Sequence, residues 1–318
     1  MLIAPIFMRV MPLGLLVLGV NAVYGQDYPN KPIRFITTAA GSSSDFAARI
    51  IAQGISPTLG TVIVDNRPSL PIAGQLLAKS PPDGYSVIYT GGALWIDALL
   101  RKPPYDPVKD FAAVTLVASS PDILVVHPAL PVKSVTDLIA LAKSEPGKLN
   151  FGTSTIGGAS HLSAELLKSM AGINITHVPY KGNGAIPALL SGEIQMLFEG
   201  GATLTPHIQA GRLRALAVTT AKPSALFPGM PTIAASGLPG FECTVMNVIF
   251  APAKTPEGII NRLSQEIVQF LRRKDTQERF FNAGVEIVGS TPEELAATMK
   301  SDMAKWDKVI KEANIKVD

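Results

Sequence analysis

Residues 33–59 read IRFITTAAGSSSDFAARIIAQGISPTL: a β-rich run, a Gly- and Ser-rich turn, and then a helical pattern. We expect a strand over residues 33–38, because Ile, Phe and Thr favour extended backbone. We expect a helix over residues 46–59, because its small and apolar residues recur at helical spacing. A strand that leads through a short turn into a helix is the first half of a parallel α/β unit.

The same alternation continues along the chain. Further strands are expected at residues 61–65, 86–90, 123–126, 149–152, 175–178, 195–198 and 213–219, and further helices at residues 135–142, 160–170 and 185–190. Towards the C-terminus, apolar residues at helical spacing predict helices around residues 260–270 and 295–310, with a short strand at residues 285–288 between them. This order predicts an α/β fold, with mostly parallel sheets flanked by helices.

Two blocks of alternation indicate two lobes. The blocks meet near Pro128 and again in the Pro- and Gly-rich region of residues 223–240. The C-terminal helices have no sheet of their own, so we expect them to pack back on the first lobe. The predicted organisation is a discontinuous first lobe of residues 26–127 and 248–318, and a second lobe of residues 128–247.

The first 25 residues have the pattern of an export signal. Arg9 precedes the apolar run of residues 10–20, which is too short to span a membrane, and small residues follow it. We expect cleavage after Gly25, with cleavage after Ala22 as the alternative and an uncleaved anchor as the competing interpretation. No later stretch of the sequence reaches spanning length without a charge, Pro or Gly. The mature protein is therefore expected to be soluble and exported.

The composition argues against several classes of function. Only 17% of the 318 residues are charged, and 28 Lys and Arg balance 25 Asp and Glu, so we expect no nucleic-acid partner. The short basic run of residues 271–274 is expected at a helix end, where cations suit the dipole. The lone Cys243 rules out an internal disulfide, and the four histidines lack metal-ligand spacing. Since no nucleotide fingerprint occurs either, we expect no metal and no cofactor.

Two Gly- and Ser-rich turns are candidate anion sites. Each follows a strand and opens a helix, where backbone N–H groups and hydroxyls meet the positive end of the helix dipole. Both lie at carboxyl ends of strands, so one turn from each lobe would face a shared cleft. Ordinary helix capping explains either turn alone equally well. The candidate ligand-binding residues in the turns are Gly41, Ser42, Ser43, Ser44, Asp45, Ser154, Thr155, Gly157, Gly158, Ala159, Ser160 and His161.

Two further candidates, Gly92 and Tyr180, follow other predicted strands. For Tyr180, as for Trp95, lining the cleft and plain packing are equally good interpretations. We expect His161 to support the second turn, and His127 and His177 to lie at strand ends with satisfied ring nitrogens.

A serine hydrolase is the competing interpretation. Residues 152–156 (GTSTI) come close to the Gly-x-Ser-x-Gly nucleophile elbow, but Ile156 stands where the second Gly belongs. Such an enzyme would use Ser154, His161 and an acid such as Asp122. The spacing of Ser154 and His161 does not by itself give a hydrogen-bonded pair, and no oxyanion motif accompanies them. We therefore expect no enzymatic activity.

Several short phrases occur in an order that resembles one known family. They are residues 28–33 (YPNKPI), 66–68 (NRP), 82–85 (PDGY), 105–111 (YDPVKDF), 146–149 (PGKL), 160–162 (SHL), 178–182 (VPYKG) and 251–256 (APAKTP). Together they closely resemble the Bug family of periplasmic solute-binding proteins, the TctC-like receptors of tripartite tricarboxylate transporters. The resemblance covers essentially the whole mature chain and depends on no single phrase.

The resemblance implies a two-lobed, type II-like periplasmic-binding-protein fold, and a monomeric receptor that captures a small organic carboxylate between its lobes. By position, the ligand would be held by backbone amides and hydroxyls of residues 41–45 and 154–160. Asp45 matches a family aspartate that opens the first helix; it would orient water or read a ligand amine, with helix capping as the alternative. The implied partners are the membrane subunits of a tripartite transporter or, alternatively, a sensor kinase.

Three departures from the family pattern leave the ligand open. Residues 42–44 are serines where the family has glycines, and residues 69–74 are shorter than the family's glycine-rich run. The resemblance places Met246 and Asn247 in a cleft segment where the family more often has an aromatic residue. No family ligand is therefore carried over to this chain.

Overall fold

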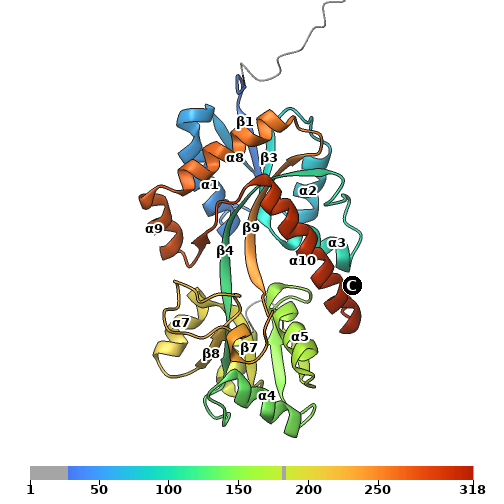
Figure 1. Cartoon of the computed structure of the whole chain (residues 1–318), viewed down its shortest axis with the longest axis vertical. Coiled ribbons are helices and arrows are strands. Elements are labelled where there is room, and N and C mark those ends of the chain that lie inside the picture. The colour runs from blue at the N-terminus through green and yellow to red at the C-terminus, as the bar shows by residue number, and fades with distance from the viewer. Residues whose placement is uncertain (1–27, 181–183, 318) are drawn as a thin grey trace, which may run out of the picture.

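The computed structural model describes residues 28–180 and 184–317, and these form two lobes, one above the other in Figure 1. The predicted export signal lies outside the described residues, as do residues 181 and 182 of the 178–182 phrase. Within the described ranges, every helix is too short or too polar to cross a membrane.

The elements follow one another in three groups along the chain. The first group is β1 (Ile33–Thr37), α1 (Ser43–Leu59), β2 (Val62–Asn66), α2 (Leu70–Ala78), β3 (Ser86–Gly91), α3 (Ala93–Leu100) and β4 (Phe111–Val126). The second is α4 (Val135–Ser144), β5 (Asn150–Thr153), α5 (Ala159–Ala171), β6 (Thr176–Pro179), α6 (Ala185–Ser191), β7 (Met196–Gly200), α7 (Gly201–Gln209), β8 (Arg214–Val218) and the 3-10 turn η1 (Ala234–Ser236). The third is β9 (Thr244–Pro252), α8 (Glu257–Leu271), α9 (Lys274–Asn282), β10 (Glu286–Ile287) and α10 (Pro292–Glu312).

One continuous sheet runs through both lobes, in the strand order β2-β1-β3-β9-β4-β7-β5-β6. The outer strands pair in parallel, β1 with β2 and β3, and β5 with β6 and β7. Strands β4 and β9 run antiparallel to their neighbours, so the sheet is parallel only towards its two edges. The predicted two-lobed α/β class is confirmed, with antiparallel strands added where the lobes join.

Strand β4 belongs to both lobes. Its residues 111–121 pair with β9, and its residues 122–126 pair with β7 and β8. Figure 1 shows β4 and β9 as long strands that run side by side between the lobes. We propose that the lobes divide near Pro121 and Thr244, where the pairing changes, a few residues before the boundaries expected from sequence.

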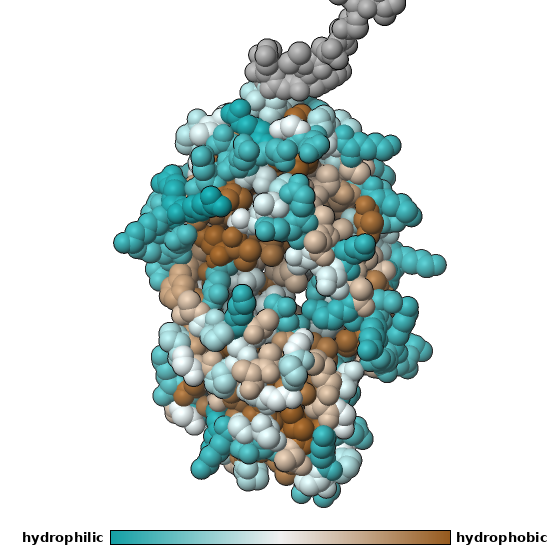
Figure 2. Space-filling model, viewed as in Figure 1, coloured by the Kyte–Doolittle hydropathy of each residue, from teal (hydrophilic) through white to brown (hydrophobic). Residues whose placement is uncertain are grey.

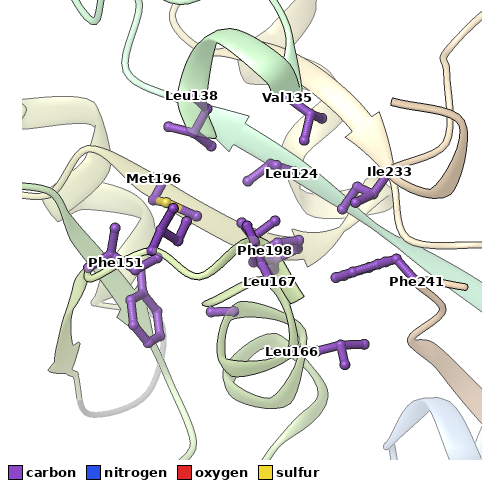
Figure 3. Close-up of a cluster of buried hydrophobic side chains, with 14 of the residues drawn as sticks. Leu124, Val135, Leu138, Phe151, Leu166, Leu167, Met196, Phe198, Ile233 and Phe241 are labelled. Carbon is purple, nitrogen blue, oxygen red and sulfur yellow. The ribbon is translucent and has the colours of Figure 1, made fainter. Parts of the chain in front are cut away.

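Each lobe has its own hydrophobic core. In the first lobe, Ile51, Ile55 and neighbouring residues of α1 pack with Ile260, Ile267 and neighbouring residues of α8. In the second lobe the core lies between β4, β5, β7 and the helices α4 and α5, as Figure 3 shows for Leu124, Phe151, Leu166, Met196 and Phe198 among others.

Helix α10 joins the two cores. It begins with a capping box, in which Thr291 and Glu294 exchange hydrogen bonds. Its first half places Leu295 in a core cluster of the first lobe, whereas its second half places Trp306 in the core of the second lobe. The C-terminal helices were expected to pack back on the first lobe; α8 does so, and α10 packs on the second lobe as well.

The sequence patterns missed several elements. The first part of β4, the whole of β9 and the helices α2, α3, α7 and α9 were not expected. Strand β9 is buried on both faces over its last five residues, so it shows no alternation of polar and apolar residues. Helix α2 uses the segment after Asn66-Arg67-Pro68, with Ser69 as N-cap and Pro71 in its first turn.

Candidate functional site

A cavity of about 270 Å³ lies where the lobes meet, and we call it the interlobe cavity. Residues of α1, β3 and α9 line it from the first lobe, and the β7–α7 junction lines it from the second. The crossing strands β4 and β9 contribute residues 120–122 and Val245 and Asn247. Figure 2 shows apolar side chains on the upper lobe near the waist between the lobes. A ligand in this cavity would touch both lobes, so their closure would enclose it.

The amino end of α1 supplies one wall of the interlobe cavity. Gly41 has a φ of 80°, which favours glycine, and it turns the chain from β1 towards the helix. Ser42 is the N-cap, and its hydroxyl accepts a hydrogen bond from the Asp45 amide at 3.2 Å. Ser43, the first helical residue, lines the cavity. The positive end of the α1 dipole therefore meets the cavity, which suits an anionic group.

The carboxylate of Asp45 makes its polar contacts with other groups of the protein. Its carboxylate accepts from the Gly41 amide at 2.9 Å and from the Asn66 amide side chain at 2.8 Å, and it pairs with Arg49 at 2.9 Å. The Gly41 hydrogen bond is the main reason that the pKa of Asp45 falls to about 2. These contacts indicate that Asp45 holds the turn before α1 in place rather than binding an amine of the ligand.

Two carboxylic residues line the interlobe cavity from β4 and β7. Asp122 is 4% exposed, and its backbone exchanges hydrogen bonds with the Thr219 hydroxyl. Glu199 accepts a hydrogen bond from the Gly200 amide at 3.0 Å. Burial, and then repulsion from Glu199, raise the pKa of Asp122 to about 7. The cavity thus has a negative side as well as the positive end of α1.

The second predicted turn lies beside a separate cavity. Ser154 lines a space of about 220 Å³ together with Ala185, Ile186, Thr203 and Glu199. Glu199 lines both cavities, so it stands between the turn after β5 and the interlobe cavity. Of the predicted ligand-binding residues, the structure places Ser43 and Ser154 in the linings of these two cavities.

Much of the second turn is occupied by its own hydrogen bonds. The Gly157 amide donates to Nδ1 of His161 at 3.0 Å, and the Gly158 amide donates to the Thr155 carbonyl at 3.2 Å. Gly158 is the N-cap of α5, which leaves the amides of Ala159 and Ser160 in the first turn of the helix. His161 therefore supports the turn, as the sequence predicted.

His161 is a buried, neutral imidazole. It stacks on His177 with ring centres 4.1 Å apart, and His177 stacks on Phe151 at 4.8 Å. Burial lowers the pKa of His161 to about 3. Its Nε2 lies 3.8 Å from a Glu165 oxygen. Because its two ring nitrogens face Gly157 and Glu165, this geometry does not favour the hydrolase in which His161 would activate Ser154.

The remaining candidates make contacts within the protein. The Gly92 amide donates to the Met246 carbonyl at 3.0 Å, which extends the pairing of β3 with β9. Tyr180 donates its hydroxyl to Glu193 at 2.8 Å, in the turn before β7. Trp95 is fully buried and donates its indole N–H to Asp302 of α10 at 2.8 Å, so it packs rather than lines a cavity.

Sequence reasoning missed Tyr89 and Glu199 as cavity residues and considered Asp122 only as a hydrolase acid. The rule that found the first two turns also applies to residues 199–203, where a strand leads through two glycines into α7. Applied to every strand-to-helix junction, the rule would have found Glu199. Among residues 28–180 and 184–317, no group of three or more His, Cys, Asp or Glu is arranged to hold a metal ion.

Known proteins place this chain in a family. A family model described as the tripartite tricarboxylate transporter family receptor matches residues 47–315. A UPF0065 protein from the tcbD–tcbE intergenic region of Pseudomonas sp. strain P51 is 35% identical over 292 residues, which cover 90% of this chain and 87% of that protein. BugT of Bordetella pertussis is 32% identical over 308 residues, which cover 94% of each chain.

Solved structures agree with this assignment. Rpa4515 of R. palustris, solved with adipate, is 35% identical with a TM-score of 0.73, covering 91% of this chain and 99% of that chain. MatC from Rhodopseudomonas palustris, solved with bound malate, is 26% identical with a TM-score of 0.69, covering 89% of this chain and 100% of that chain. The chain therefore belongs to the TctC family of tripartite tricarboxylate transporter receptors, the family of the Bug proteins that its sequence resembles.

Proposed function

We propose that this protein is a periplasmic receptor that captures a small organic carboxylate between its lobes. The observation that carries the proposal is the interlobe cavity, which both lobes line and which the amino end of α1 faces. Backbone amides and the Ser43 hydroxyl are suitable donors for a carboxylate, and the helix dipole adds attraction. The protein binds and releases its ligand without catalysing a reaction.

Family membership supports the same proposal. The relatives solved with adipate and malate hold small dicarboxylates, and a cavity of about 270 Å³ accepts molecules of that order of size. The closed, ligand-bound form would be presented to the membrane subunits of a tripartite transporter, or to a sensor kinase. Residues 1–25 would direct export to the periplasm.

A thermal-shift screen tests the receptor function. The full mature chain, purified without refolding, is mixed with mono-, di- and tricarboxylates, amino acids and pyridine carboxylates, and native mass spectrometry detects any ligand carried through purification. A ligand at about one hundred times its Kd stabilises the folded state by about 2.7 kcal/mol. We expect at least one compound to raise the melting temperature, whereas a flat response across the panel contradicts the proposal.

A further inference from the structure

The interlobe cavity has an unusual charge balance for a receptor of anions. Asp122 and Glu199 line it, and its described lining residues include no Lys, Arg or His. A dicarboxylate placed there would bring a second negative group towards two carboxylic residues in a poorly solvated space, which is unfavourable. The charge balance therefore favours a ligand with a positive group on this side of the cavity.

Asp122 lacks the compensation that buried carboxylates normally have. It is 4% exposed, and among the described residues its hydrogen bonds involve only its backbone. Asp45 shows the contrast, because its buried carboxylate accepts two hydrogen bonds and pairs with Arg49. The pKa of Asp122 is raised to about 7, first by burial and then by Glu199, and a nearby cation would reverse that shift.

A second buried polar side chain lines the same cavity without a partner. Tyr89 is 1% exposed, and the hydrogen bonds between described residues leave its hydroxyl unused. Phe46 and Phe280 add further aromatic surface to the lining. Aromatic rings beside carboxylates are the surroundings that a positively charged nitrogen prefers. Both unpartnered groups, Tyr89 and Asp122, are thus available to a ligand.

We propose that the ligand is a small organic acid that also carries a positively charged nitrogen, and that Asp122 and Glu199 face this nitrogen. The carboxylate of the ligand then lies at the amino end of α1, near Ser43, on the side of the cavity opposite the two carboxylic residues. The inference rests on the proposed receptor function and narrows its ligand class from carboxylates to zwitterions.

Matched ligand pairs test this inference by isothermal titration of the full mature chain. Glutarate and γ-aminobutyrate share three methylenes and differ in one end group, carboxylate or ammonium; succinate and aspartate differ by one added ammonium. We expect the ammonium-bearing member of at least one pair to bind the wild type tenfold or more tightly. Asp122→Asn and Glu199→Gln should each weaken that ligand at least tenfold and leave the plain dicarboxylate unchanged or tighter.

The control variant is Asp307→Asn, which removes a carboxylate from the half-exposed ion pair with Lys311 on α10 and should change neither ligand. The inference is overturned if the dicarboxylates bind the wild type as tightly as their partners do. It is also overturned if Asp122→Asn weakens both members of a pair equally, as a protonated Asp122 that donates to a ligand carboxylate would predict. Binding by dicarboxylates alone leaves the receptor function intact, whereas no binding by any acid in the wider panel contradicts that function itself.

Discussion

Replacing Trp306 with alanine is expected to lower the free energy of unfolding by about 3–5 kcal/mol, as the truncation of a buried aromatic side chain does. Trp306 is 2% exposed and belongs to the core of the second lobe, although the first half of α10 packs in a core cluster of the first lobe. Urea unfolding followed by far-ultraviolet circular dichroism measures the loss, since this signal does not depend on tryptophan emission.

Trp306→Phe is the matched control. It keeps an aromatic ring in the core and should cost clearly less than the alanine substitution. A loss below about 1 kcal/mol for Trp306→Ala would contradict the position of the helix, because an exposed residue costs little on truncation. The expected result supports the finding that α10 joins the cores of both lobes.

Asp122→Asn is expected to stabilise the ligand-free protein, and the gain should grow with pH. In the wild-type folded state the pKa of Asp122 is about 7, whereas in the unfolded chain it is near 3.8. Between these values the unfolded state binds fewer protons, so wild-type stability falls as pH rises through this window. Asparagine carries no charge and escapes this loss. We expect little difference near pH 4 and a gain of about 2–4 kcal/mol near pH 8.

Thermal or urea unfolding of the two proteins from pH 4 to pH 8 measures the difference directly. Comparing variant with wild type at each pH cancels the titration of groups that do not interact with Asp122. A difference that stays constant with pH would contradict the buried, unpaired state of Asp122. A variant that is more stable but binds its ligand less well would fit the common exchange of stability for function at binding sites.

The sequence predicted the parts of the fold that depend on local pattern. Residues 33–59 form a strand and a helix, as their spacing indicates, although the helix begins at Ser43, before the expected start at residue 46. The crossing strands β4 and β9 were harder to predict from sequence. Strand β4 has register shifts against β9, and its mixed burial pattern matches neither the strand period nor the helix period. Likewise, the position of α10 depends on contacts between distant segments, which a periodic pattern cannot specify.

The candidate site divides in the same way. Gly- and Ser-rich turns at strand ends pointed to Ser43 and Ser154, which line cavities; ligand binding by these turns stays a prediction. The same turns could not reveal that Asp45 is held by Asn66 and Arg49, since these partners come from other elements or another turn of the helix. The charge balance of Asp122 and Glu199 emerges only when β4 pairs with β7.

The most direct test of the central claim is to block the interlobe cavity and measure ligand binding. Gly200 lines the cavity, has an extended backbone that any residue adopts, and a Cβ there meets no atom within 4 Å. Gly200→Leu should therefore fold normally while placing a side chain in the space of the ligand. Gly258→Leu is the control, because a Cβ on Gly258 also meets nothing and α8 lies outside the cavity lining. We predict that isothermal titration with the organic acid found in the thermal-shift screen shows at least a hundredfold weaker binding for Gly200→Leu and unchanged binding for Gly258→Leu. Unchanged binding by a folded Gly200→Leu variant would contradict the claim that the ligand lies between the lobes.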